Sequence, residues 1–276
     1  METTKIFLKD LIRKSVSKNK FFKRNILKEY LQILVLDFIY SHKKYSQLFF
    51  YGGSCLSHCF NLPRLSQDLD FVDISKKIKI SELAEDLERY FNQNTDIEVR
   101  AISQKFRIYL KFSLLHELKI ADRNESDLLF LKIEIFKDFD FCRVYKTEIV
   151  PLFKFNKTIL VKTFDLSTLM ATKIRAILHR KWKKTDKKGK TIARVKGRDY
   201  FDLMWYLERK IKPNLKCLKG IRKTEELKEK LLEILKKLDA KSIQNDLEPL
   251  IEDYNLVKNL SKNLKGILIR QIENMK

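Results

Sequence analysis

The chain has 276 residues, of which 44% are hydrophobic and 34% are charged, and its formal net charge is +22. This apolar content supports a folded protein of one large or two ordinary domains and excludes a fully disordered chain. A positive surplus of this size indicates a polyanionic partner, and nucleic acid is favoured over a membrane.

Export and membrane insertion are not indicated by the sequence. The N-terminal stretch METTKIFLKD carries charges where a secretory signal needs apolar residues. The longest uncharged run, residues 45–63, contains glycine, serine, asparagine and histidine and is a poor membrane span. The four cysteines, Cys55, Cys59, Cys142 and Cys217, are too few and too scattered for a disulfide framework. We therefore expect a cytoplasmic protein without a membrane partner.

The first quarter of the chain predicts two helices, a strand and a turn. Apolar side chains at helical spacing place both helices within residues 5–44. Residues 47–51 (QLFFY) predict a buried strand that ends at Gly52-Gly53, and Ser54 is expected to N-cap a short helix. After Pro63, the sequence LDFVDI continues as a strand.

The rest of the chain predicts more strands and then helices. Residues 79–94 have helical spacing, and KFRIYLKF (105–112) alternates apolar with basic or aromatic side chains, as a half-buried strand does. Residues 128–136 predict another strand, and the pattern is helical from Ser167 onward. We therefore predict an α+β fold with a mixed sheet over roughly residues 45–160, a helical N-terminal segment and a helical C-terminal half. The predicted domains are 1–160 and 161–276.

Three carboxylates stand out on the predicted strands. Asp68 and Asp70 are one residue apart, so their side chains point to the same face of a strand. Glu134 lies on the polar face of the predicted strand 128–136. If the two strands are neighbours, the three carboxylates converge into a site for one or two Mg²⁺ ions. Free backbone N–H groups after the glycine turn would then cradle a phosphate. A solvated strand edge, or a surface role for Glu134 alone, is the alternative.

The ordered motifs resemble a known family. GGS, the later QDLDF, Lys173 in TLMATKIRAILHR, and Arg198-Asp199 in GRDYFDLMWYL occur in the order seen in the AbiEii/AbiGii type IV toxin nucleotidyltransferases. This family belongs to the polymerase-beta-like nucleotidyltransferase superfamily. The likeness covers about residues 47–210, and it implies a mixed-sheet nucleotidyltransferase core.

The resemblance also implies a reaction and assigns roles to residues. A nucleotide would pass from a nucleoside triphosphate to an acceptor hydroxyl with the help of Mg²⁺. The implied roles are triphosphate binding for Gly53 and Ser54, metal binding for Asp68 and Asp70, a phosphate contact for Lys173, and either essential acid or lysine-positioning group for Asp199. The family's third carboxylate varies, and here Glu134 is our candidate. Ser66 matches a serine that some members modify, and Asp202 would support Asp199 or cap its helix.

A basic segment suggests the acceptor. Residues 173–198 hold 12 basic residues and 1 acidic residue, half of the chain's net charge. They predict a contact surface for phosphates, on which Trp182 and His179 would stack with bases, or else a solvated loop. We expect RNA as acceptor, in particular the 3′ end of tRNA, with blocked translation as the outcome and a cognate antitoxin as a further partner. A non-catalytic nucleic-acid-binding protein, or an enzyme that modifies a protein side chain, is the alternative.

Overall fold

The computed structural model describes residues 3–139, 142–180, 184–185, 191–193 and 195–275. The chain forms two compact units. The first consists of Met1–Phe139 and Glu148–Thr163, and the second of Asp140–Thr147 and Phe164–Lys276. Each unit is considered by itself below. Our division of the chain at residue 160 into two domains stays a prediction.

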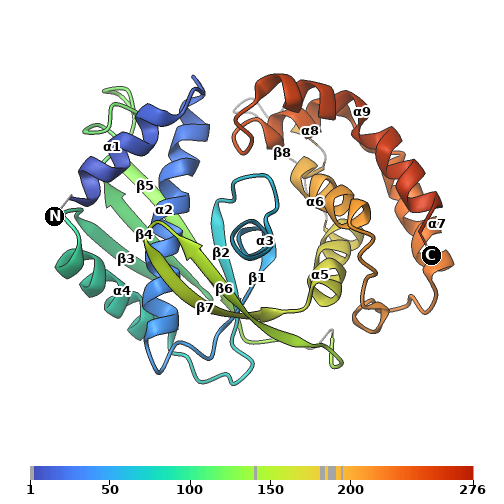
Figure 1. The fold of residues 1–276 in the computed structure, drawn as a ribbon, viewed down its shortest axis with the longest axis horizontal. Helices are drawn as coiled ribbons and strands as arrows, with labels where there is room; N and C mark the ends of the chain where they lie inside the picture. Colours follow the sequence, from blue (N-terminus) through green and yellow to red (C-terminus); the bar gives the residue numbers. More distant parts are fainter. Residues whose placement is uncertain (1–2, 140–141, 181–183, 186–190, 194, 276) are drawn as a thin grey trace. The chain divides into compact units, whose positions relative to one another are not determined.

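A seven-stranded mixed sheet forms the centre of the first unit, with the strand order β3-β4-β5-β2-β1-β7-β6 (Figure 1). Strands β2 and β5 pair in parallel, as do β1 and β7, whereas β1–β2, β3–β4 and β4–β5 are antiparallel. The predicted mixed sheet and the α+β class are therefore confirmed. The strands are β1 (Phe49–Tyr51), β2 (Asp68–Val72), β3 (Val99–Gln104), β4 (Arg107–Ser113), β5 (Leu128–Phe136), β6 (Thr147–Lys154) and β7 (Lys157–Phe164).

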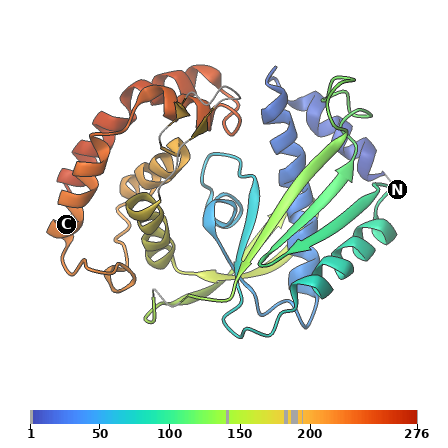
Figure 2. The same ribbon diagram turned by 180° about the vertical axis from the view of Figure 1, so that it is seen from behind.

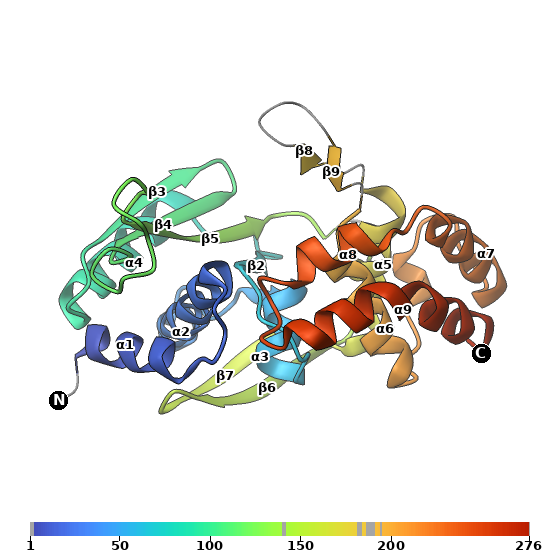
Figure 3. The same ribbon diagram turned by 90° about the horizontal axis from the view of Figure 1, so that it is seen from above.

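The alternation of apolar residues decides which face of this sheet is buried. On β4, Ile108, Leu110 and Phe112 are fully buried, while the side chains between them are only partly covered. Helix α2 packs on β5, α4 packs on β3 and β4, and α2 and α4 also contact each other. Figure 3 shows α1, α2 and α4 on one side of β3, β4 and β5, and no helix from the described part of the first unit lies on the other side. The sheet therefore has one core face and one open face.

Local capping explains where the first helices begin. Asn19 accepts from the backbone N–H groups of Phe21 and Phe22 at the start of α2, and Thr3 accepts from Ile6 N–H at the start of α1. The two helices predicted within residues 5–44 are thus confirmed. The helices of the first unit are α1 (Thr4–Lys14), α2 (Lys20–Ser41), α3 (Gly52–Phe60) and α4 (Ile80–Asn94).

The second unit is mainly helical, as predicted from Ser167 onward (Figure 1 and Figure 2). A two-stranded ladder of β8 (Lys184–Thr185) and β9 (Thr191–Ala193) was not predicted. The helices of the second unit are α5 (Leu166–His179), α6 (Gly197–Glu208), the short 3₁₀ helix η1 (Leu215–Cys217), α7 (Thr224–Leu235), α8 (Ala240–Leu247) and α9 (Tyr254–Glu273). Across the described ranges of both units, no helix is long and apolar enough to cross a membrane.

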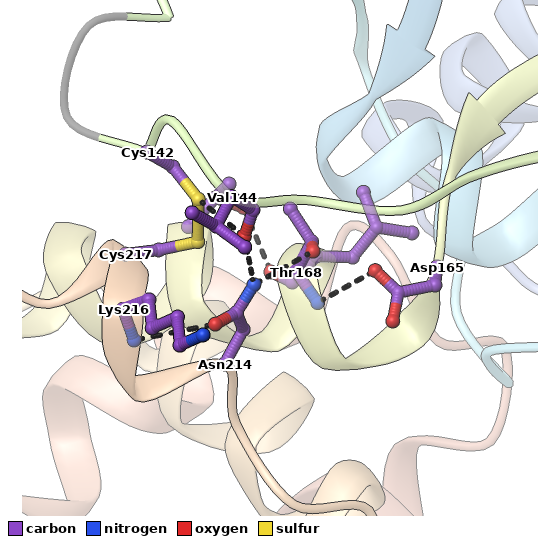
Figure 4. The surroundings of a disulfide bond; sticks show 9 residues. Cys142, Val144, Asp165, Thr168, Asn214, Lys216 and Cys217 are labelled. Carbon is purple, nitrogen blue, oxygen red and sulfur yellow. Dashed lines mark hydrogen bonds between the residues drawn. A yellow bond between two sulfur atoms is a disulfide. The ribbon is translucent and has the colours of Figure 1, made fainter.

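A disulfide between Cys142 and Cys217 links two distant segments of the second unit (Figure 4). The spacing of the cysteines gave no sign of this bridge, because the fold brings together residues that are 75 positions apart. Next to the bridge, the Asn214 side-chain amide donates to the Val144 carbonyl at 2.7 Å and lies 3.4 Å from Thr168 Oγ1 at the start of α5 (Figure 4). The bridge and Asn214 together tie the entry into α5 to the segment around η1.

Opening this disulfide should destabilise the second unit. A closed loop of this length is expected to contribute about 4 kcal/mol, mainly by restricting the unfolded chain. Cys217→Ser should therefore lower the melting temperature of the oxidised protein, and a reductant should shift the wild type to the same value. Cys59→Ser, which removes a free cysteine, is the matched control and should melt as the wild type does. Equal melting of wild type and Cys217→Ser under oxidising conditions would contradict the bridge.

Candidate active site

The glycine turn brings the chain backbone against a carboxylate. Gly52 has a φ of +81°, a conformation that L side chains rarely adopt, and a Cβ at this position would overlap Asp70 Oδ2. A Cβ on Gly53 would lie 2.8 Å from the Arg64 guanidinium and 3.1 Å from Ser66 Oγ. The two glycines are therefore needed for the close approach of the α3 N-terminus to β2.

Helix α3 begins at this turn without a side-chain cap. Its N-cap residue is Tyr51, whose side chain makes no capping hydrogen bond. The first backbone N–H groups of a helix have no partner within the helix, and they carry its positive dipole end. The start of α3 therefore offers donors to an anionic group, as expected for a phosphate cradle.

Ser54 does not cap α3, so this prediction is wrong. The helix begins two residues earlier, and Ser54 lies within its first turn and is fully buried. Its hydroxyl donates to the Asp68 carbonyl and lies 3.0 Å from Ser66 Oγ. The hydroxyl thus joins α3 to the start of β2 and to the segment before it. Ser54 organises the turn with its side chain, while its backbone remains part of the helix start.

A buried polar link supports this segment from behind. Gln32 on α2 donates from its side-chain nitrogen to the Ser66 carbonyl at 3.1 Å, and its oxygen lies 2.9 Å from His58 Nε2. Burial, together with Lys154, lowers the pKa of His58 to about 3. The imidazole is therefore neutral, and since Gln32 donates to Ser66, His58 Nε2 is the donor to Gln32. The link holds the backbone at Ser66 in place.

The two strands that carry the three carboxylates are neighbours, which was the condition for these side chains to come together. In the parallel pair of β2 and β5, Asp68 is opposite Lys132 and Asp70 is opposite Glu134. On the other side of β2, Asp70 is opposite Tyr51, the last residue before the glycine turn. The two aspartates therefore lie on the open face of the sheet, immediately beside the start of α3.

A lysine lies between two of these carboxylates. Lys132 Nζ is 3.1 Å from Asp68 Oδ2 and 3.2 Å from Glu134 Oε1, and Arg107 Nε is 2.7 Å from the same oxygen of Glu134. Partial burial alone would raise the pKa of Glu134, but Lys132 and Arg107 hold it below its ordinary value. Glu134 is thus an anion that two cations of the protein already neutralise.

This arrangement bears on the predicted metal site. Among the described residues, no group of three or more carboxylate, histidine and cysteine side chains is arranged to hold a metal ion. Asp68 and Asp70 fit a Mg²⁺ ion that takes its other oxygen ligands from a triphosphate and water. Glu134 Oε1 is engaged by both Lys132 and Arg107. The metal role of Glu134 stays a prediction without support from this geometry.

The lysine and aspartate motifs meet within the second unit. Lys173 Nζ on α5 lies 3.0 Å from Asp199 Oδ1 and 2.8 Å from Asp202 Oδ2, both on α6. Arg180 approaches the other oxygen of Asp199 at 2.6 Å. The Lys173 and Asp199 side chains are only 11% and 6% exposed, and Asp202 is completely buried. Asp199 and Asp202 thus hold the Lys173 ammonium between them, and the role of Asp199 in the reaction stays a prediction.

Neighbouring cations keep Asp199 ionised although it is buried. Burial alone would raise the pKa of Asp199, but Lys173 and Arg180 lower it to about 2. The start of α6 is also held in place, since the Arg198 N–H donates to Asp246 on α8 and a Cβ on Gly197 would overlap the Ile243 backbone. Asp199 therefore remains ionised at neutral pH, at a helix start that is held in place.

Sequence reasoning missed several residues of these two groups. No role beside the carboxylates was assigned to Lys132 or Arg107, although their alternation with buried residues placed them on the same face as the carboxylates. Two roles were left open for Asp202, support of Asp199 or capping of its helix. Its spacing of three residues from Asp199 on a helix was the signal that the two side chains share a face. Gln32 had no signal, because its role depends on the packing of α2 against α3. Trp182 and most of the basic segment between Arg180 and Val195 lie outside the described residues.

The open-face aspartates, beside a glycine turn that starts a helix, form an arrangement suited to nucleotidyl transfer. The model of the family described as "Nucleotidyl transferase AbiEii toxin, Type IV TA system" matches residues 37–260. Because this match covers most of the sequence, the chain belongs to the AbiEii family of type IV toxin–antitoxin nucleotidyltransferases.

A solved structure with the same fold is that of MenT4. MenT4, the nucleotidyltransferase toxin Rv2826c from Mycobacterium tuberculosis H37Rv, is 12% identical and aligns over 100% of this chain and 91% of its own, with a TM-score of 0.57. JHP933 from Helicobacter pylori (16% identity, 90% and 93% coverage) and another nucleotidyltransferase from H. pylori (15%, 90% and 96%) have TM-scores of 0.47 and 0.45. The curated proteins contain no match.

The buried cluster should make stability depend on acid pH. Since the pKa of Asp199 falls from 3.8 to about 2 on folding, its contribution is fully present above pH 4 and is lost as the pH falls towards 2. Between pH 5 and pH 2, the free energy of unfolding of the wild type should fall by about 2 kcal/mol more than that of Asp199→Asn. Urea titrations at each pH measure this difference, and parallel pH curves would contradict it.

Proposed function

We propose that this toxin transfers a nucleotide from a nucleoside triphosphate to a 3′ hydroxyl of RNA, in particular of tRNA, and thereby blocks translation. Family membership establishes a nucleotidyltransferase toxin of a type IV toxin–antitoxin system. Such a system includes a cognate antitoxin. The identity of the acceptor, the Mg²⁺ dependence and a cytoplasmic location belong to the proposal.

The observation that carries the proposal is the contact of the glycine turn with the paired aspartates. Gly52 lies so close to Asp70 that a side chain does not fit between them. A triphosphate bound by the N–H groups at the start of α3 would therefore lie beside the carboxylates of Asp68 and Asp70. Gly53 and Ser54 contribute these donors, and the Ser54 side chain keeps the turn against β2.

Asp68 and Asp70 are the residues that would hold Mg²⁺. The ion would neutralise phosphate charge and orient the α-phosphate. The acceptor oxygen would form a bond to the α-phosphorus, the bond between the α-phosphorus and the bridging oxygen would break, pyrophosphate would leave, and the hydroxyl proton would pass to solvent water. In the protein, the fixed turn and the paired ions around Lys132 keep the carboxylates in position before substrate arrives.

Lys173 is the proposed phosphate contact of the second unit. Its ammonium is held by two buried carboxylates, so its position is fixed and its charge is maintained. Asp199 and Asp202 act through Lys173 and are positioning residues in this proposal. Arg180 balances the second oxygen of Asp199, so that Lys173 does not have to neutralise both carboxylates alone.

The positive net charge of the chain indicates the class of acceptor. A net charge of +22 favours a polyanion over an acceptor side chain of a protein. Two alternatives remain as different outcomes of one experiment, namely a non-catalytic nucleic-acid-binding protein and an enzyme that modifies a protein. The first predicts no consumption of any nucleoside triphosphate, and the second predicts label on protein and none on RNA.

Incubation with each labelled triphosphate, Mg²⁺ and total RNA tests the function. The wild type should label RNA of tRNA size, and Asp70→Asn should lower transfer at least 100-fold at saturating nucleotide, because it removes a charged ligand. Glu134→Gln tests the third ligand. If Glu134 binds the metal, this variant should need more Mg²⁺ for half-maximal rate. Full activity of Asp70→Asn would disprove the two-aspartate site.

The role of Lys173 needs a charge-balanced variant. Lys173→Ala alone removes the cation that two buried carboxylates share and should cost about 3–5 kcal/mol of stability. Lys173→Met combined with Asp202→Asn removes the lysine and one carboxylate together, while Asp199 keeps Arg180. This double variant should fold and bind triphosphate at least tenfold more weakly in calorimetry. Asp202→Asn alone is its control, keeps Lys173 beside Asp199, and should bind triphosphate more tightly than the double variant does. Equal affinity of the double variant and the control would exclude the phosphate contact.

A further inference from the structure

The open face of the sheet extends well beyond the paired aspartates. Its outer part, which we call the outer strand face, lies on β3, β4 and β5 and is formed by Arg100, Ile102, Tyr109, Lys111 and Phe130. These residues alternate with the buried residues that face α2 and α4. None of them has a role in the proposed transfer reaction.

Strand register arranges this surface in rows. Phe130 is opposite Lys111, and Lys111 is opposite Arg100. In the next row, Tyr109 lies between Lys132 and Ile102. Successive rows on one face of a sheet are about 7 Å apart. The surface is therefore a regular array in which aromatic rings and cations are neighbours.

The composition of the array is unusual for plain solvent-exposed strands. Phe130 is 41% exposed and Ile102 is 40% exposed, so apolar area remains uncovered. Lys111 Nζ lies 5.6 Å from the centre of the Phe130 ring. On β3, β4 and β5 these two rows contain no carboxylate. Glu98, 3.7 Å from the largely exposed Arg100, lies at the outer end.

The array is continuous with the candidate active site. The row of Tyr109 continues through Lys132 to Asp68 on β2. Since all these strands belong to one sheet of one compact unit, the path from Phe130 to the aspartates is fixed by backbone hydrogen bonds. A chain lying along this path would reach the carboxylates with its end.

We infer that the outer strand face binds a single-stranded segment of the acceptor RNA close to its reacting 3′ end. Tyr109 and Phe130 stack on bases, and Lys111 and Arg100 contact phosphates. Exposed aromatic residues on a sheet, flanked by cations, are a recurrent platform for unpaired bases. A duplex does not suit this surface, because its bases are stacked within the helix. The inference rests on the proposed function, since it requires an RNA acceptor.

Binding of a fluorescently labelled 12-nucleotide single-stranded RNA, measured by anisotropy from 50 to 200 mM salt, tests the inference. Tyr109→Leu and Phe130→Leu keep apolar bulk but remove the ring, and each should weaken binding about tenfold. Tyr109→Phe keeps the ring and should retain the wild-type affinity. Lys111→Ala should lower the slope of log affinity against log salt by about 0.7.

Matched controls come from other parts of the first unit. Phe153 is a 72% exposed phenylalanine on β6, and Lys18 is an exposed lysine before α2. Phe153→Ala and Lys18→Ala should both bind the RNA as the wild type does. Triphosphate binding, measured by calorimetry, should stay unchanged in every variant of the outer strand face, because these side chains lie outside the glycine turn and the aspartates.

The outcomes separate this inference from the proposed function. If the wild type labels RNA while Tyr109→Leu and Phe130→Leu bind the oligonucleotide with unchanged affinity, the inference is overturned and the proposed function stands. If the wild type binds triphosphate but neither labels nor binds RNA, the RNA acceptor is overturned, and the inference falls with it. Selective loss of RNA binding in the two leucine variants, with normal triphosphate binding, supports both.

Discussion

The parallel pairing of β2 with β5 decides where the charges of the first unit's site lie. This register sets Asp68 opposite Lys132 and Asp70 opposite Glu134, so that one lysine and three carboxylates share this face of the two strands. A shift by one residue would turn the aspartates into the core and the leucine and phenylalanine of DLDFV towards solvent. Because Leu69 and Phe71 are completely buried, such a shift is strongly disfavoured. Hydrophobic burial on one face thereby fixes the charge pattern on the other.

The same pairing gives Lys132 a role that a bare cluster of carboxylates would not have. Three carboxylates without a counterion repel one another, and their pKa values rise. Lys132 and Arg107 supply a permanent counterion on the Glu134 side, so the site stays ordered when no nucleotide is bound. Asp70, on the opposite side, is beside the glycine turn. At the Glu134 end of the site, cations of the protein neutralise the carboxylate. The Asp70 end lies beside the start of α3.

The second unit also places carboxylates and cations next to one another, and there they are more deeply buried. One ammonium and one guanidinium group pair with two carboxylates in the cluster of Lys173, Arg180, Asp199 and Asp202. The two aspartates have little exposure to solvent. Burying charges is costly unless each has a partner at good geometry. The balance of charges within the cluster meets this requirement. Its rigidity explains why a lysine with long, flexible methylene links keeps a defined position on α5.

The sequence by itself determined the periodicity-based features: the α+β class, the two N-terminal helices, the strands around DLDFV and LLFLKIEIF, and the motifs that identify the family. Local patterns encode these, because burial on one face repeats every two residues in strands and at 3.6 residues in helices. Only the tertiary structure decided that Ser54 bonds to β2 instead of capping α3, that Cys142 pairs with Cys217, that Arg107 pairs with Glu134, and that Gln32 supports Ser66. Each of these depends on the distance between segments far apart in the chain, and that distance results from packing, which no local pattern specifies.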